Sequence, residues 1–135
     1  MSKYRIPSEK SKYYIPREDY LTAIHYSLRY PLWLAEVKAK ADTSKAIRYD
    51  KEKVQVSNDF DSTSEAAIRI SEINEKIKVI DEVIKQVAPD MEYWLRLGVC
   101  YGLTFEQLKS KGLAYERDAY YLMRRHYYYE LSRRI

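Results

Sequence analysis

The sequence predicts an all-α protein, a helical bundle that ends in a trihelical helix-turn-helix unit. Glycine is rare, with three residues in 135, and glycine is unfavourable inside helices. Between residues 63 and 87, apolar residues recur at steps of three and four, which is the spacing of one helix face. The C-terminal segment then reads as a short helix, a glycine turn and a longer helix, which is the layout of a helix-turn-helix.

Residues 1–15 are predicted to form a flexible basic arm. The segment Lys3-Tyr-Arg-Ile-Pro recurs nine residues later as Lys12-Tyr-Tyr-Ile-Pro, and each proline biases the preceding residue toward an extended backbone. The arm would either enter a DNA groove and bind phosphate or be an unordered terminus. An N-terminal helical pair is expected over residues 16–41, because Pro16 suits a first helical turn and Pro31 interrupts the pattern.

Residues 42–62 carry no helical apolar stripe and are predicted to form a polar linker, with weak strand character at Val54–Val56. A long helix is expected from Thr63, a suitable N-cap residue, to Ala88, where Pro89 ends it. Its a/d seam contains Ile70, Ile73, Ile77, Ile80 and Ile84. A seam of this kind predicts either packing within the chain or a homodimer through these isoleucines.

The predicted C-terminal domain, residues 63–135, joins the long helix to the trihelical unit. Its three helices are expected over 90–101, 104–110 and 116–134. Thr104 is a good N-cap, and Gln107 three residues later completes a capping box. Gly112 can adopt the positive φ at which a helix ends sharply. In the last helix we assign four residues to the core: Tyr120, Met123, Tyr127 and Leu131.

The remaining positions of the last helix are both basic and aromatic. Arginine makes bidentate contacts to guanine edges or phosphate, and tyrosine hydroxyls commonly bind phosphate. The predicted DNA-binding residues are Thr104, Tyr115, Arg117, Tyr121, Arg124, Arg125 and Tyr128. The alternative interpretation is an amphipathic terminal helix with an ordinary solvated basic face.

The distribution of charge fits a polyanionic partner. Residues 1–17 hold five basic side chains against one acidic, and residues 103–135 hold seven against four. The middle of the chain holds twelve against fifteen. Two basic ends flanking a slightly acidic middle favour binding to double-stranded DNA, although solvated faces with random asymmetry would give the same totals.

No enzyme activity, cofactor or metal is expected. His25 and His126 have no partners at metal-ligand spacing, and Cys100 lies in an apolar helix, where it reads as a core residue. The chain also lacks a glycine-rich phosphate loop. No apolar stretch approaches the length of a membrane span and no secretion signal is visible, so a cytoplasmic location is expected.

A family resemblance sharpens the DNA-binding hypothesis. The segment from Arg117 to Ile135, after a Thr-Phe-Glu-Gln-Leu helix, resembles the end of small phage and prophage transcriptional regulators of the ArpU/RinA kind, which look like region 4 of bacterial sigma factors. The matching pattern is Arg117-Asp118, Tyr120-Tyr121, Arg124-Arg125, Tyr127-Tyr128-Tyr129 and Leu131-Ser132-Arg133-Arg134. The chain departs from it at Glu116, where a small residue is expected, and at Leu122-Met123, where polar residues are expected. The resemblance implies a sequence-specific regulator that binds near late-gene promoters, with host RNA polymerase as a partner.

A second function stays open from the sequence. The chain could be a helical protein-interaction module, such as a phage-encoded binder or inhibitor of a host protein, with no specific DNA binding. That hypothesis predicts sensitivity to substitutions at Leu122 or Tyr121, whereas the DNA-binding hypothesis predicts sensitivity at Arg124 and Arg125.

Overall fold

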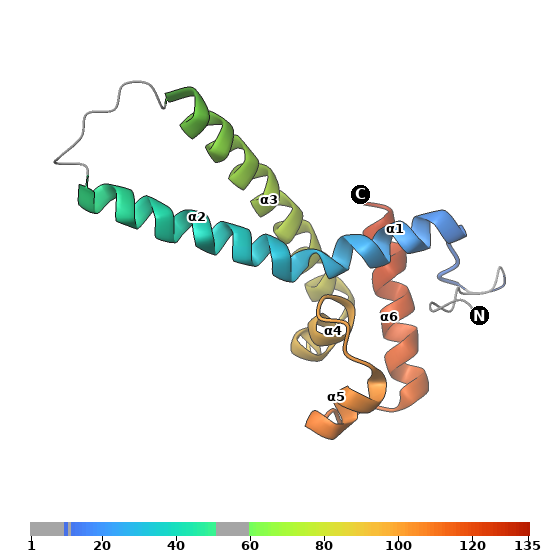
Figure 1. Ribbon diagram of the computed structural model, residues 1–135. Coiled ribbons are helices and arrows are strands. Elements are labelled where there is room, and N and C mark those ends of the chain that lie inside the picture. The colour runs from blue at the N-terminus through green and yellow to red at the C-terminus, as the bar shows by residue number, and fades with distance from the viewer. Residues whose placement is uncertain (1–9, 11, 51–59) are drawn as a thin grey trace. The chain divides into compact units, whose positions relative to one another are not determined.

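The protein folds as helices joined by short turns wherever its structure is described. The computed structural model describes residues 10, 12–50 and 60–135, with side chains for 10, 12–42 and 64–135. The described helices are α1 (Arg17–Leu28), α2 (Tyr30–Asp50), α3 (Phe60–Val87), α4 (Glu92–Val99), α5 (Phe105–Lys111) and α6 (Arg117–Ser132) (Figure 1). These residues contain no strand, which confirms the all-α prediction.

The predicted helix boundaries in the C-terminal half were accurate, whereas the predicted polar linker was wrong over much of its length. Helix α2 continues to Asp50 and α3 already begins at Phe60. Residues 42–50 contain neither glycine nor proline, so a helix that is already formed can propagate through them without an apolar stripe. The strand character expected at Val54–Val56 lies outside the described residues.

The N-terminal helical pair divides close to the expected position. Helix α1 ends with Arg29 as its C-cap, and α2 begins at Tyr30, so Pro31 lies in the first turn of α2. Proline is tolerated there because the N–H that it lacks would have no helical acceptor.

Backbone contacts divide the chain into two compact units. The first unit comprises residues 1–30 and 79–135, and the second comprises residues 31–78. The divisions fall inside α2 and α3 rather than at the predicted linker. Within the second unit, Arg69 donates to Glu36 at 2.7 Å and the Lys76 ammonium lies 5.5 Å from the centre of the Trp33 ring.

The core of the first unit is rich in tyrosine. Helix α1 packs against α4 and α6, and it crosses α6 near the C-terminal end of α6 (Figure 1). The Tyr20 and Tyr128 rings meet edge to face at 5.3 Å. The Ser27 and Tyr127 hydroxyls are hydrogen-bonded at 2.8 Å inside this contact, which satisfies two buried polar groups at once.

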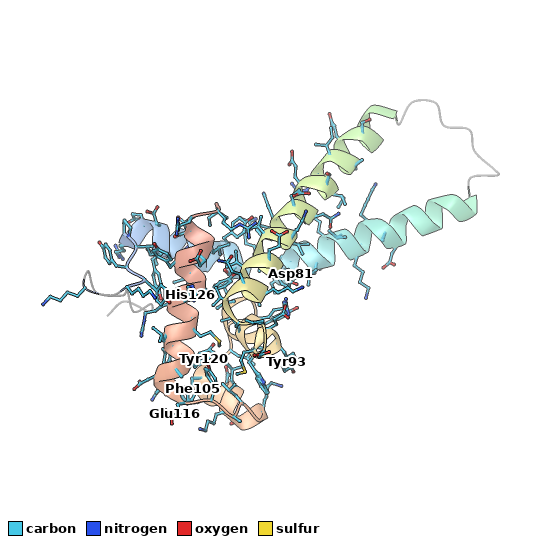
Figure 2. The ribbon with its side chains drawn as sticks, turned by 180° about the vertical axis from the view of Figure 1, so that it is seen from behind. Asp81, Tyr93, Phe105, Glu116, Tyr120 and His126 are labelled. Carbon is cyan, nitrogen blue, oxygen red and sulfur yellow. The ribbon has the colours of Figure 1, made fainter. Side chains whose placement is uncertain are left out.

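A glycine on α4 gives room to a second buried tyrosine. A Cβ at Gly98 would lie 1.9 Å from the Tyr120 hydroxyl oxygen, so only glycine fits beside this ring. The Tyr120 hydroxyl is buried and makes no hydrogen bond within the described part of the chain. Figure 2 labels Tyr120 together with Phe105 of α5, whose rings lie 5.7 Å apart.

A polar cluster links the start of α2 to α3 and α4. The Asp81 carboxylate accepts from the Tyr30 hydroxyl at 2.8 Å and from the Arg96 guanidinium at 2.9 Å (Figure 2). Burial and this hydrogen bond raise the pKa of Tyr30. Nearby Cys100 is buried, and burial raises its thiol pKa to about 12, so the thiol is protonated at neutral pH. Its assignment to the core is confirmed.

The isoleucine seam of α3 is used for packing within the chain. Ile73, Ile80 and Ile84 are buried, whereas Ile70 and Ile77 are partly exposed. A homodimer through this seam would have to break the packing that these three buried side chains already have within the chain. The packing therefore favours the intramolecular alternative. No described helix combines the length and apolar character needed to cross a membrane.

Candidate nucleic-acid interface

The turn between α5 and α6 is fixed by its caps. The Thr104 hydroxyl accepts from the Gln107 backbone N–H at 3.2 Å, and the Gln107 side chain accepts from the Thr104 N–H at 2.8 Å. Gly112 ends α5 with a φ of 116° and Leu113 beyond it is buried. The predicted capping box and glycine turn are both confirmed. They fix where α5 begins and ends, and so where the turn toward α6 starts.

Cationic side chains gather around an aromatic cluster that spans this turn. The Phe105 ring is approached by the Lys109 ammonium at 5.8 Å and by the Arg117 guanidinium at 5.7 Å. Tyr121 lies next to Phe105, and the guanidinium of Arg117 lies 5.8 Å and that of Arg124 4.8 Å from its ring centre. We call Lys109, Arg117, Tyr121 and Arg124 the basic–aromatic strip. It runs from α5 across the turn to the middle of α6.

Arg124 anchors the strip to the core. Burial raises the pKa of Tyr20, and the positive charges of Arg124 and Arg125 oppose that rise. Burial likewise raises the pKa of Tyr120, again opposed by Arg124. The Arg124 guanidinium thus lies near two buried tyrosines while it stacks on the more exposed Tyr121. An arginine held in this way loses less conformational freedom when it binds a phosphate.

One side chain of the strip is partly neutralised. The exposed Arg117 donates to the Glu106 carboxylate at 2.5 Å. A phosphate that approaches Arg117 must therefore compete with Glu106. Glu116 and Asp118, which flank Arg117 in the sequence, are also exposed. Their carboxylates add negative charge next to the cationic strip.

The structure brings some of the predicted DNA-binding residues together and separates others. Arg117, Tyr121 and Arg124 are contiguous, and Arg125 adjoins them on α6. The hydroxyl of Thr104 is engaged in its cap, and Tyr115 lines a groove near the end of α3.

The assignment of Tyr128 to the DNA-binding face was wrong. Its side chain is 5% exposed and packs against Tyr20, so α1 separates it from solvent. Burial also raises the pKa of its hydroxyl. The helical period of α6 alone places Tyr128 beside Arg117 and Arg124, and only the position of α1, far away in sequence, buries it.

Sequence reasoning missed two members of the cluster, Lys109 and Glu106. Lys109 follows Phe105 by four residues, which places the two side chains on one helix face. That spacing was the available signal for Lys109. Glu106 contacts Arg117 across the turn, a pairing that no local pattern encodes.

The last residues of the predicted flexible arm lie against α6. The Tyr13 ring stacks on His126 with 4.4 Å between ring centres and 17° between planes, and it is tilted against Tyr129 at 5.7 Å. Ile15 is buried. Residues 12–15 are thus docked rather than free, whereas residues 1–9 and 11 lie outside the described residues.

Among the described residues, no group of three or more His, Cys, Asp or Glu side chains is arranged to hold a metal ion. No protein-family model matches the chain, and no curated protein or solved structure is detectably similar to it. The resemblance to phage regulators therefore stays a prediction.

Proposed function

We propose that the α5–turn–α6 unit binds double-stranded DNA, with the first two turns of α6 facing a groove and the basic–aromatic strip on phosphates. The observation that supports the proposal is the strip itself. Lys109, Arg117 and Arg124 converge on one aromatic cluster across a capped turn, and Arg125 extends the positive charge along α6. Arginines and lysines so held suit a row of phosphates, which supplies most of the affinity in protein–DNA contacts.

The proposed role is that of a sequence-specific phage transcriptional regulator acting in the cytoplasm of the bacterial host. It extends the DNA-binding proposal by the resemblance to ArpU/RinA-like regulators and to sigma region 4. In that role the protein would act near late-gene promoters together with host RNA polymerase. The sigma-like interpretation predicts that the N-terminal turns of α6 reach base edges, as those of a recognition helix do.

The test is DNA binding across a salt series. Fluorescent fragments of the phage or prophage genome that encodes the chain are titrated with the wild-type protein and with Arg125→Ala and Arg117→Ala variants. We expect selective binding that weakens steeply with salt, and each variant should reduce the salt slope by about one, because each removes about one phosphate contact.

The matched control is Arg69→Ala, which removes the same charge from an exposed arginine of the second unit. Circular dichroism verifies that each variant is folded. Weak binding to every fragment, equally affected by Arg69→Ala and Arg125→Ala, would contradict the proposal and leave only a generic basic background.

The alternative function is a protein-interaction module without specific DNA binding. One observation favours it: Leu122 on α6 is 50% exposed and lines a groove. A Leu122→Ser variant separates the two functions, because it should leave the salt-dependent part of DNA binding intact while weakening a protein contact.

A further inference from the structure

A groove runs along the flank of α6 that faces away from the basic–aromatic strip. It has a volume of about 500 Å³ and lies between the C-terminal end of α3, the turn that follows it, and α6. Ala119, Leu122 and His126 line it from α6. At 100° per residue, these positions lie on the opposite side of the helix from Arg117, Tyr121 and Arg124.

The walls of the groove are mainly apolar. Its apolar lining includes the half-exposed Leu122 together with Met91, Met123 and Val87. Methionine side chains adapt their shape to different apolar partners, which is why they recur on binding surfaces. One end is formed by the Tyr13 ring stacked on His126 (Figure 2 labels His126).

The electrostatics of the groove favour a cation. Helix α3 is 28 residues long, and the negative end of its dipole opens here. Pro89 has no N–H, so it cannot donate to the Lys85 carbonyl as a helical residue would. The exposed Asp90 carboxylate lies beside this end. The described residues that line the groove include no lysine or arginine, although Lys85 lies in the last turn of α3 and the Lys12 ammonium lies 5.5 Å from the centre of the Tyr13 ring.

We propose that this groove docks a short segment of a partner protein in which an aliphatic side chain lies next to a lysine or arginine. The aliphatic group would pack between Leu122 and Met91, and the cation would face Asp90 and the end of α3. A polyanion does not suit the same site, since its phosphates would meet a carboxylate and a negative helix end. The proposal is independent of DNA binding, because it concerns the other flank of α6.

The experiment uses the full chain and three labelled peptides of equal length. The basic–apolar peptide is Ala-Leu-Leu-Arg-Lys-Ala, the charge-reversed peptide is Ala-Leu-Leu-Glu-Asp-Ala, and the peptide without aliphatic anchors is Ala-Ser-Ser-Arg-Lys-Ala. Fluorescence anisotropy measures affinity. Methyl-labelled methionine reports the location by NMR, because the chain has only three methionines and two of them, Met91 and Met123, line the groove.

We expect the basic–apolar peptide to bind at least about tenfold more tightly than the other two, with shifts at Met91 and Met123. Leu122→Ser should weaken it about tenfold or more, the size of effect given by one apolar group in a pocket. Asp90→Asn should weaken it about two- to fivefold at low salt, in the range of exposed ion pairs. Leu32→Ser and Asp42→Asn make the same changes at exposed sites of the second unit and should have no effect.

Three outcomes would overturn the proposal. The first is equal affinity for the three peptides, or no detectable binding of any peptide up to about 1 mM. The second is a shift of Met91 and Met123 on addition of duplex DNA but not of peptide, which would assign the groove to DNA. The third is a shift of both signals in a Tyr4→Ser variant without peptide, which would assign the groove to the chain's own Lys3–Pro7 segment.

Discussion

The two halves of α6 both contain neighbouring tyrosines, which lie in different environments. Residues 117–125 carry Arg117, Tyr121, Leu122 and Arg125 on surfaces that solvent reaches. Residues 126–132 are just as aromatic, but Tyr127, Tyr128 and Leu131 are buried. Helix α1 contributes to the difference, because it crosses α6 near its C-terminal end, where Tyr20 and Ser27 of α1 contact Tyr128 and Tyr127 (Figure 1). The first half of α6 thus buries one face, through Tyr120 and Met123, and presents the other to solvent, whereas α1 covers part of that other face in the second half.

The comparison shows that tyrosines in this chain take two roles, one at the surface and one in the core. Where α1 is absent, the ring of Tyr121 supports two guanidinium groups. Where α1 is present, Tyr127 and Tyr128 fill the interior, with the hydroxyl of Tyr127 satisfied by Ser27. A tyrosine can do either because its body is apolar and its tip is polar.

The largest expected effect is a difference in stability between alanine variants in the two halves of α6. Tyr128→Ala should lower the free energy of unfolding by about 3–5 kcal/mol, because it leaves a cavity under α1. Tyr121→Ala should cost only about 1 kcal/mol, the value of its ring contacts at a partly exposed site, while weakening DNA binding. Urea denaturation measures both. Equal losses of stability for the two variants would mean that α1 does not distinguish the halves.

Local features of this fold were predictable from the sequence, and contacts distant in sequence were not. The caps at Thr104 and Gly112 and the core positions Tyr120, Met123, Tyr127 and Leu131 follow from rules that act within a turn or two of helix. The burial of Tyr128 depends on Tyr20, which lies more than a hundred positions away.

The same distinction explains which parts of the candidate site could be predicted from the sequence. Arg117 and Arg124 could be predicted because basic residues outside the core positions of a helix can be recognised in the sequence. The Glu106 contact and the docking of Tyr13 on His126 are tertiary contacts without a local signal. The linker error arose differently: absence of an apolar stripe was taken as absence of helix, although a helix that continues from a packed segment needs no stripe of its own.

The second-largest expected effect is a loss of folding stability at alkaline pH, caused by buried groups that include tyrosines in the second half of α6. Burial raises the pKa of Tyr127 and Tyr128 above the ordinary value of 10.0, and that of Cys100 from 9.0 to about 12. The unfolded chain therefore loses these protons at lower pH than the folded chain does. Stability should be constant up to about pH 8.5 and fall as pH rises through the ordinary cysteine and tyrosine values.

Urea midpoints between about pH 7 and 11 measure this loss, with tyrosinate absorbance recorded in parallel. The buried tyrosines should ionise together with unfolding rather than before it. A midpoint that does not change over this range, or ionisation of all fifteen tyrosines in the folded state, would show that α1 leaves the second half open to solvent.

A smaller effect should follow from adding one carbon to α4. Gly98→Ala places a Cβ against the Tyr120 hydroxyl, and overpacking of this kind costs about 1–3 kcal/mol. Tyr120→Phe removes the hydroxyl, which has no partner among the described residues, and should be close to neutral alone. The double variant should recover part of the Gly98→Ala loss. Simple additivity of the two changes in a double-mutant cycle would contradict this contact.

The smallest effect on stability should come from Glu106 of α5, which pairs with Arg117 in the exposed first half of α6, and its replacement should tighten DNA binding. Glu106→Gln removes the carboxylate that pairs with Arg117, and an exposed pair of this kind contributes at most about 1 kcal/mol. Without Glu106 as a competitor, the Arg117 guanidinium should bind phosphate more strongly, so affinity for DNA should rise and the salt slope should steepen, while Glu36→Gln in the second unit should change neither. A gain of binding cannot come from partial unfolding, so this variant tests the strip more sharply than any loss. Unchanged or weaker binding would mean that Arg117 does not face DNA, and the interface would then have to lie elsewhere on the first half of α6.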